Sequence, residues 1–194
     1  MKNFMFVAVF AFAFTAFSQN KILPKDVQIK MAVMAAPEMY QDDATVLGYN
    51  PDGELVSLRE GNNGVICLAD DPEKEGISVA CYAAELEPFM ARGRELVAEG
   101  KSNKEKQEVR KVEIDAGTLT MPKEPSMVYV LGAEEKDLNP ETGELQNSRI
   151  RYVLYKPYMT GASTGLPTKP QAPGMPWLMD ADTHRSHIMI SPAN

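Results

Sequence analysis

Histidine and cysteine, which build many catalytic and metal sites, are rare in this sequence. Its 194 residues include two histidines, two cysteines and one tryptophan. There is no H-E-x-x-H motif, no glycine-rich phosphate loop and no C-x-x-C pair. The zinc-protease, nucleotide-binding and thiol-redox classes therefore have no signature here, and an enzyme would need residues that only the fold brings together.

Concentrated positive charge is also missing. The chain has 27 acidic and 20 basic residues, a formal net charge of -7, and no block of lysines or arginines. Nucleic acids and anionic membrane surfaces are bound through positive patches, so neither is expected as a partner. Asp70 and Asp71 lack the regular calcium-loop pattern and are interpreted as solvated loop carboxylates.

One apolar run stands at the start of the chain. Lys2 precedes the uncharged residues 4–17, and residues 16–18 (Ala-Phe-Ser) offer small side chains at the positions that a signal peptidase reads. The run is shorter than the about 20 residues of a membrane-spanning helix. We expect residues 1–18 to be a cleavable signal peptide and residues 19–194 to form one exported domain, periplasmic or extracellular and not stably inserted in a membrane. An uncleaved anchor is the alternative.

Both cysteines follow the predicted cleavage site. An exported chain meets oxidising conditions in which cysteines pair, so we expect a disulfide between Cys67 and Cys81 that closes the polar loop between them. A reactive or metal-binding pair is the alternative, although neither cysteine lies in a C-x-x-C motif.

Apolar spacing predicts two or three helices. Residues 24–36 carry apolar side chains at i, i+4, i+7 and i+8, and residues 84–99 carry a second helical stripe. Ser102 and Glu105 have the spacing of a capping box, which predicts a helix from Asn103. The sequence does not fix where this helix ends, because residues 106–121 fit both a helical and a strand period.

Short apolar runs between turn residues predict an antiparallel sheet. Residues 45–49 and 55–58 flank an Asn-Pro-Asp-Gly turn and predict a hairpin. Further strands are predicted over residues 65–68, 77–82, 127–131, 150–155 and 187–191. The fold class that follows is α+β, an antiparallel sheet packed with two or three helices in a single domain.

Residues 157–176 form the most irregular segment, with five prolines, three glycines and no apolar period. Long irregular loops in compact domains are often binding elements or lids. Met175, Trp177 and Met179 lie at the end of this loop, and an exposed tryptophan there would anchor a ligand or partner. The alternative is that Trp177 packs the loop onto the core.

Both histidines of the sequence lie in one eight-residue segment near the C-terminus, residues 180–187. Asp180, Asp182, His184 and His187 are candidate ligands for zinc or a similar ion, which could activate a water for hydrolysis. Residues three apart on a strand point to opposite faces, so the two histidines converge only if the segment is a loop. The alternative is a surface loop with one hydrogen-bonded histidine.

Two short motifs carry a resemblance. Residues 59–67 read R-E-G-N-N-G-V-I-C and are followed by Asp70 and Cys81, and residues 187–190 read H-I-M-I. They resemble a set of uncharacterised exported bacterial proteins that share an R-E-G-x-N-G-x-x-C segment and a closing H-I/V-M strand. The resemblance implies export and a common domain, with no known activity. Val65 and Ile66 stand where a Trp and a small residue are expected in the relatives, which argues against an aromatic ligand platform at that point.

Taken together, these features predict an exported, non-enzymatic binding or interaction domain. Residues 157–179 would recognise a protein or small-molecule partner, and no cofactor is expected. A metal-dependent hydrolase that uses residues 180–187 is the alternative.

Overall fold

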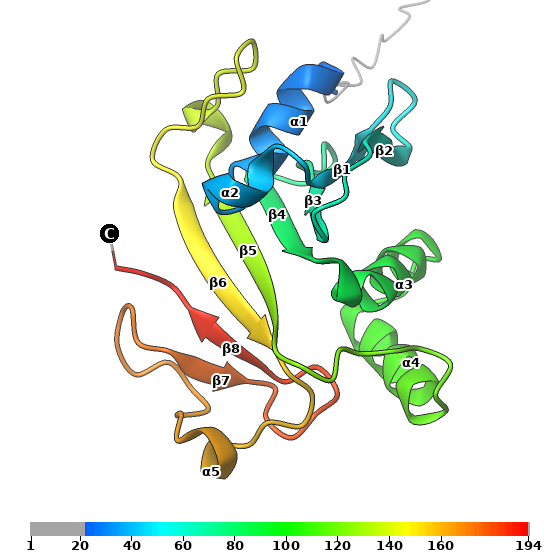
Figure 1. The fold of residues 1–194 in the computed structure, drawn as a ribbon, viewed down its shortest axis with the longest axis vertical. Helices are drawn as coiled ribbons and strands as arrows, with labels where there is room; N and C mark the ends of the chain where they lie inside the picture. Colours follow the sequence, from blue (N-terminus) through cyan, green and yellow to red (C-terminus); the bar gives the residue numbers. More distant parts are fainter. Residues whose placement is uncertain (1–21, 194) are drawn as a thin grey trace, which may run out of the picture.

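A single eight-stranded sheet organises residues 22–193, which the computed structural model describes (Figure 1). The predicted signal peptide lies outside these residues. The strand order is β2-β1-β3-β4-β5-β6-β8-β7. The strands are β1 (Thr45–Tyr49), β2 (Leu55–Arg59), β3 (Val65–Leu68), β4 (Ile77–Ala83), β5 (Ser126–Ala133), β6 (Arg149–Tyr155), β7 (Trp177–Met179) and β8 (His187–Ile190).

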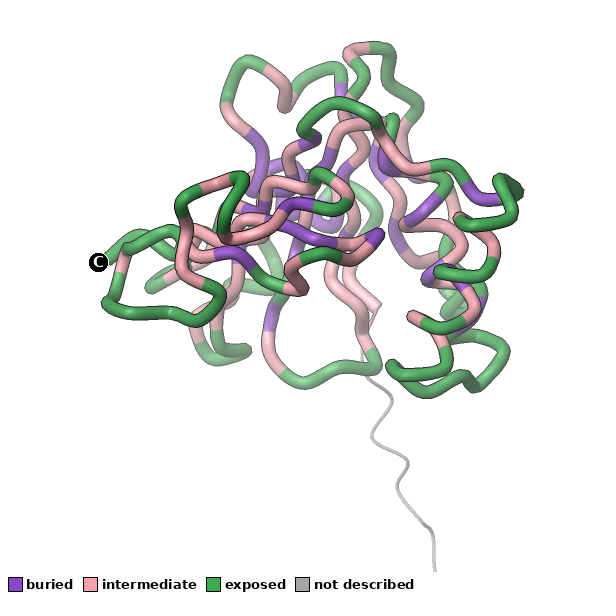
Figure 2. Tube along the Cα trace, turned by 90° about the horizontal axis from the view of Figure 1, so that it is seen from below, coloured by how far each residue is buried: buried purple, intermediate pink, exposed green. Residues whose placement is uncertain are grey.

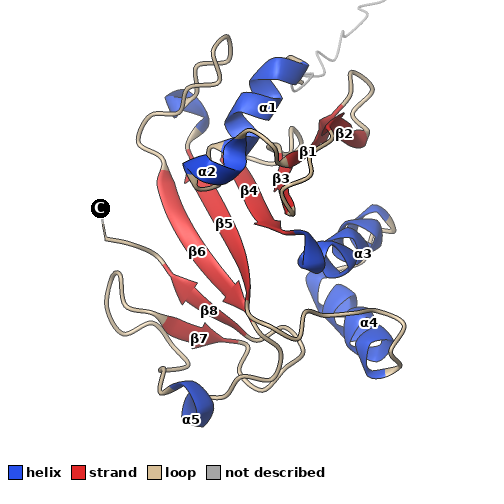
Figure 3. Ribbon diagram, in the orientation of Figure 1, coloured by secondary structure: helices blue, strands red, loops and turns tan. Residues whose placement is uncertain are grey.

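The predicted α+β class in a single domain is confirmed, with one difference in the sheet. All neighbouring strands pair antiparallel except β1 and β3, which run parallel. The chain reaches this parallel pairing because the β1–β2 hairpin folds outward and leaves β2 at the edge of the sheet (Figure 3). The sheet is therefore mixed rather than wholly antiparallel.

Residues 22–193 also form five α-helices. They are α1 (Lys25–Val33), α2 (Glu38–Gln41), α3 (Glu87–Ala98), α4 (Asn103–Asp115) and α5 (Gly161–Thr164), with 3-10 turns η1 (Ala84–Leu86) and η2 (Glu135–Asp137). In Figure 1, α1 and α2 lie against the sheet near β1 and β4, whereas α3 and α4 pack together beyond the end of β4. No helix within residues 22–193 is both long and apolar enough to cross a membrane.

Two apolar clusters form the core. One gathers α1 with β1, β3, β4 and β5, and the other joins α3 to β4, β5 and β6. Successive residues Cys81 and Tyr82 of β4 belong to different clusters, because neighbouring side chains of a strand point to opposite faces. Figure 2 shows buried positions gathered in the middle of the molecule and exposed loops at its rim.

Several predicted elements are confirmed, and the end of the helix that begins at Asn103 is now defined. Ser102 caps α4, since its side chain accepts a hydrogen bond from the backbone N–H of Glu105 while Glu105 bonds back to the Ser102 N–H. The helix continues to Asp115 and the chain turns at Gly117, where φ is 73°. The structure adds α5 inside the proline-rich segment and β7 directly after it, neither of which was predicted.

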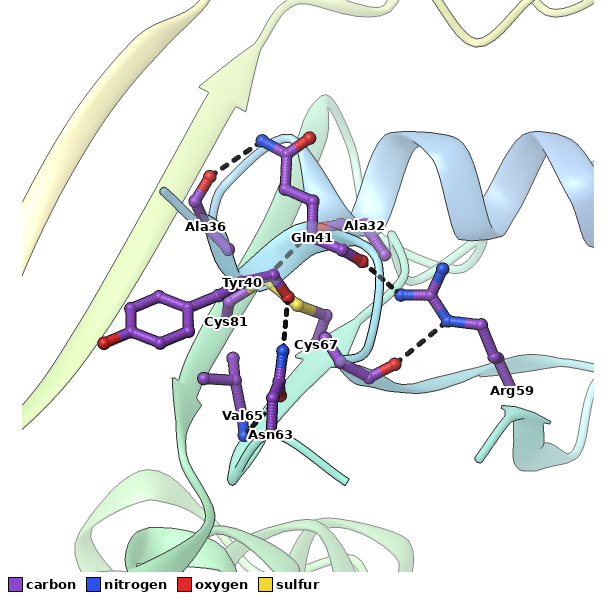
Figure 4. The surroundings of a disulfide bond; sticks show 10 residues. Ala32, Ala36, Tyr40, Gln41, Arg59, Asn63, Val65, Cys67 and Cys81 are labelled. Carbon is purple, nitrogen blue, oxygen red and sulfur yellow. Dashed lines mark hydrogen bonds between the residues drawn. A yellow bond between two sulfur atoms is a disulfide. The ribbon is translucent and has the colours of Figure 1, made fainter. Parts of the chain in front are cut away.

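The Cys67–Cys81 disulfide is present, joining β3 to β4 (Figure 4). Both cysteines are fully buried, and Sγ of Cys81 lies 3.2 Å from the carbonyl oxygen of Ala32 at the end of α1. The bond therefore closes the loop between β3 and β4, as predicted, directly beneath the first helix.

The R-E-G-x-N-G-x-x-C segment has a structural explanation at its polar positions. The guanidinium of Arg59 donates to the backbone carbonyls of Ala44, at 2.9 Å, and Gln41 (Figure 4). The side-chain amide of Asn63 donates to the carbonyl of Tyr40 at 2.7 Å. Both side chains hold the segment around α2 to the sheet by satisfying its backbone acceptors.

Both glycines of the segment are also explained. A Cβ on Gly61 would lie 2.2 Å from the carbonyl oxygen of Asp43, so no other residue fits without a backbone shift. Gly64 has a φ of 76°, a region that L-amino acids with side chains rarely occupy. The segment therefore fixes the path of the chain between β2 and β3.

Candidate functional site

Two adjoining hollows lie where β6, β8 and β7 meet the end of the proline-rich segment. Their volumes are about 560 and 540 Å³, and both are bordered by Arg149, Ser191 and Pro192. The first is also lined by Met175, Trp177, Gly174, Pro170, Gln171, Ala172 and Pro173, and the second by Arg151, Ser78, Val130, Gly132 and residues of the β5–β6 connection. We call these hollows together the Trp177 groove.

Strand register explains why distant residues share this groove. Met189 of β8 pairs with Val153 of β6 on one side and with Trp177 of β7 on the other. Residues at i and i+2 of a strand share a face, so Arg151 and Arg149 follow Val153 along the same face of the sheet. Residues far apart in the sequence therefore meet on one surface.

The two arginines give the groove a local positive charge. The residues Arg149 and Arg151 are both exposed, and neither forms an ion pair with any acidic side chain in residues 22–193. Lys136 at the far rim is instead paired with Glu134 at 2.6 Å. Glu134 and Asp137 line the second hollow as well. Lys136 occupies Glu134, and Asp137 accepts a hydrogen bond from Asn147 at 2.9 Å, so the two guanidinium groups remain without an ion pair in the described part of the chain.

The predicted ligand-binding residues are partly brought together. Met175 and Trp177 line the first hollow. Met179 is 36% exposed on β7 but does not line either hollow. Sequence reasoning missed Arg149 and Arg151, because their only signal was an alternation of charged and apolar residues along a predicted strand, which is common on solvent-facing strands.

The predicted metal ligands are engaged in contacts of other kinds. Asp180 accepts a hydrogen bond from Arg185 at 3.0 Å. Nδ1 of His187 lies 2.8 Å from the carbonyl oxygen of Arg185, and its ring stacks on Tyr155 with centroids 4.8 Å apart. The backbone N–H of Asp182 donates to the carbonyl of Met159 at 2.7 Å. These contacts fold the segment onto β6 and the start of the proline-rich loop.

His184 lies in a separate, mostly aromatic environment. Its ring meets Phe89 edge-on with centroids 6.2 Å apart, and the guanidinium of Arg110 covers the same Phe89 ring at 3.8 Å. Burial, followed by the charge of Arg110, lowers the pKa of His184. Neither ring nitrogen has a hydrogen-bond partner within residues 22–193. The residue docks the C-terminal segment against α3 and α4, where its surroundings disfavour the protonated ring.

The geometry offers no support for the metal site. Across residues 22–193 there is no group of three or more His, Cys, Asp or Glu side chains that could hold a metal ion. The segment is indeed a loop, as convergence would require, but Oδ1 of Asp180 bonds to Arg185, Nδ1 of His187 lies against a backbone carbonyl, and the ring of His184 is turned toward Phe89.

One short serine motif is not among the predicted site residues. Residues 161–165 read G-A-S-T-G and match the G-x-S-x-G pattern of the hydrolase nucleophile elbow, which requires a strand before the turn and a helix after it. Here the preceding strand β6 ends at Tyr155 and does not lead directly into the motif, and Ser163 belongs to the capping box of α5. Its hydroxyl donates to the carbonyl of Thr160 at 3.1 Å and accepts from the Thr160 N–H at 3.0 Å, so it serves as a helix cap.

Comparisons with known proteins identify no relative: no family model, no curated protein and no solved structure matches the chain.

Proposed function

We propose that this protein is an exported, non-enzymatic binding domain that holds an extended acidic segment of a partner protein in the Trp177 groove. The observation that carries the proposal is the position of Arg149, which borders both hollows and lies across from Trp177. If a ligand carboxylate bound Arg149, the next side chain of the same ligand would enter the first hollow and contact Trp177.

The shape of the groove favours an extended ligand. The two open hollows share a border of Arg149, Ser191 and Pro192, so an extended segment can occupy both, whereas one compact molecule would fill only one of them. Prolines 170, 173 and 192 stiffen the walls of the first hollow. A rigid wall loses little conformational entropy when a ligand binds.

Charge and surface chemistry favour an acidic ligand. Arginine binds carboxylates through two parallel N–H donors, and tryptophan supplies a large apolar surface at low entropic cost. Arg149 and Arg151 have no acidic partner among the described residues, so a ligand carboxylate would not have to displace an existing ion pair.

Export is part of the same proposal. A buried disulfide is typical of proteins that fold in oxidising compartments, which supports a periplasmic or extracellular location. The resemblance to exported bacterial proteins points in the same direction. The hydrolase alternative receives no such support, since His184 and His187 are both held in packing contacts.

The tryptophan itself reports on the groove, because it is the only one in the chain. The experiment titrates short peptides that carry one phenylalanine and two aspartates and follows Trp177 emission. Peptides with asparagine in place of aspartate are the ligand control. We expect a saturable emission change with the acidic peptides only, weakened about tenfold in Arg149→Gln.

The matched protein control is Lys104→Gln, which removes the same charge from a side chain 85% exposed on α4 and outside the groove. It should bind like the unaltered protein. Equal binding of aspartate and asparagine peptides, or no emission change with any peptide, would overturn the proposal.

A further inference from the structure

We propose that a second pocket, built around Asp70, binds a small organic cation with an apolar body, such as an alkyl- or arylammonium compound. The pocket has a volume of about 260 Å³ and shares no lining residue with the groove. The proposal is therefore independent of the proposed function.

Three parts of the chain enclose this Asp70 pocket. The first helix α1, the loop between β3 and β4, and the connection between β5 and β6 each contribute a wall. Figure 1 shows the β5–β6 connection beside α1. The contact is close, since a Cβ on Gly143 of the connection would lie 3.1 Å from Cγ of Met31.

The floor and sides of the pocket are largely apolar. Leu23, Met31, Ile77 and Leu138 face it. Such walls accommodate a hydrocarbon body but offer nothing to a fully hydrated ion, whose desolvation would cost more than the apolar contacts return. An organic ligand therefore fits better than a bare metal ion.

Carboxylates supply the polar side of the pocket. Oδ1 of Asp70 accepts a hydrogen bond from the Ser78 N–H at 2.7 Å, and Oε1 of Glu135 accepts from the Gly76 N–H at 3.3 Å. Neither carboxylate forms an ion pair with a basic side chain in the described part of the chain. Two carboxylates thus border an apolar space, and neither of them is ion-paired within residues 22–193.

Among the residues that the structure describes, Lys74 is the only basic one that lines the pocket, and its charge is already engaged. Its ammonium lies 2.6 Å from Asp71, a neighbour of Asp70 that does not line the pocket. The net charge facing a ligand is therefore negative. This balance selects a cation over a neutral or anionic ligand of the same shape.

Asp70 is not the solvated loop carboxylate that the sequence indicated. Burial raises its pKa to about 6, and burial together with Asp71 and Asp70 raises the pKa of Tyr49, also in the pocket, to about 12. Burial thus makes ionisation of Asp70 costly, and a bound ammonium would relieve that cost.

The pocket wall is held in place before any ligand arrives. Gln28 of α1 is 5% exposed. Its side-chain amide donates to the carbonyls of Leu23 and Tyr49 at 2.7 and 2.9 Å, and its Oε1 accepts from the Tyr49 N–H at 2.8 Å. These bonds lock the helix to the end of β1, so binding requires little ordering of the protein.

The test measures binding of benzylammonium and hexylammonium ions by calorimetry or NMR titration at pH 7.5, with benzyl alcohol and hexanol as neutral counterparts of similar shape. We expect saturable binding of the ammonium compounds, at least about tenfold tighter than that of the alcohols. Asp70→Asn should lose this preference, because the amide keeps the acceptor for Ser78 but not the charge. Binding should also weaken as the pH falls below about 6, where Asp70 is protonated.

Glu75→Gln is the matched control, since it removes an exposed carboxylate from the same loop outside the pocket lining. It should leave ammonium binding unchanged, and Trp177 emission should not respond to the ammonium ligands. Equal affinity for ammonium compounds and alcohols would overturn the proposal, as would equal losses in Asp70→Asn and Glu75→Gln.

Discussion

Cys67 and Cys81 are direct cross-strand partners in β3 and β4, and their disulfide closes the loop that carries Asp70. The two residues are 14 positions apart and fully buried. The bond therefore restrains one wall of the Asp70 pocket and, through the contact of Cys81 with Ala32, the end of α1.

Removing this bond should lower stability substantially. Replacement of both cysteines by alanine is expected to reduce the free energy of unfolding by about 3 kcal/mol, because the unfolded chain regains the freedom of a loop of this length. Urea denaturation with and without reductant measures this change in the free energy of unfolding. Reductant should destabilise the unaltered protein and leave the double variant unchanged; equal sensitivity of the two would contradict a structural disulfide.

Gly61 should tolerate no side chain. Gly61→Ala is expected to cost about 2 kcal/mol or more, since its Cβ would lie 2.2 Å from the Asp43 carbonyl oxygen and the backbone must shift. Gly132→Ala is the control, because a Cβ there would lie 3.6 Å from the Ile77 carbonyl oxygen, an ordinary contact. Thermal melts of both variants decide the matter, and equal melting temperatures would remove the close approach as the reason for this glycine.

Local chemistry made much of the fold predictable. The capping box at Ser102 and the turn at residues 50–53 each mark an element end within a few residues, so α4 and the β1–β2 hairpin followed directly. The β7 strand did not, because three residues after a proline-rich loop carry too short a pattern to show a period.

Only fragments of the candidate sites could be predicted. Trp177 stood out because it is the single tryptophan beyond a long loop, whereas Arg149 and Arg151 gain their role from strand register, which no local pattern encodes. The Asp70 pocket depends on three segments that meet only in the fold. The resemblance segment pointed to a shared feature, which the structure explains by backbone contacts of Arg59 and Asn63.

His184 should make the protein sensitive to acid. Burial lowers its pKa in the folded state below the ordinary value of 6.5, so the unfolded chain binds the proton more readily. The contribution is fully favourable above about pH 6.5 and is lost as the pH falls below it. The neighbouring charges of Arg110, Arg185 and Lys111 act in the same direction, and Asp115 opposes them.

His184→Phe should therefore flatten the fall in stability between pH 7 and pH 5, because phenylalanine retains the contact with Phe89 without a titrating group. Urea denaturation at several pH values gives the slope. An unchanged slope in the variant would assign the acid sensitivity to other groups, of which His187 is the first to replace, since burial lowers its pKa as well.

Asp70 should have the opposite effect on stability. Its pKa is raised to about 6 in the folded state, so its favourable contribution is present below the unfolded value near 4 and is lost as the pH rises through about 6. At pH 7 the ionised group is a cost, and Asp70→Asn should stabilise the protein by about 1 kcal/mol after allowance for its partial exposure. Melting at pH 4 and pH 7 tests the sign: a variant less stable than the unaltered protein at pH 7 would show that the carboxylate is not destabilising there.

Trp177 and Leu178 are neighbours on β7 that point to opposite faces. Variants at these two positions therefore distinguish an effect on binding from an effect on stability. Leu178 is fully buried, so Leu178→Ala should lower the free energy of unfolding by about 2–5 kcal/mol. Trp177 is half-buried and lines an open hollow, so Trp177→Ala should cost about 1 kcal/mol or less while abolishing the binding of acidic peptides. Calorimetry reports peptide binding once the fluorophore is gone, and melting reports stability. If Trp177→Ala proved as destabilising as Leu178→Ala, the tryptophan would belong to the core and the groove would lose its anchor.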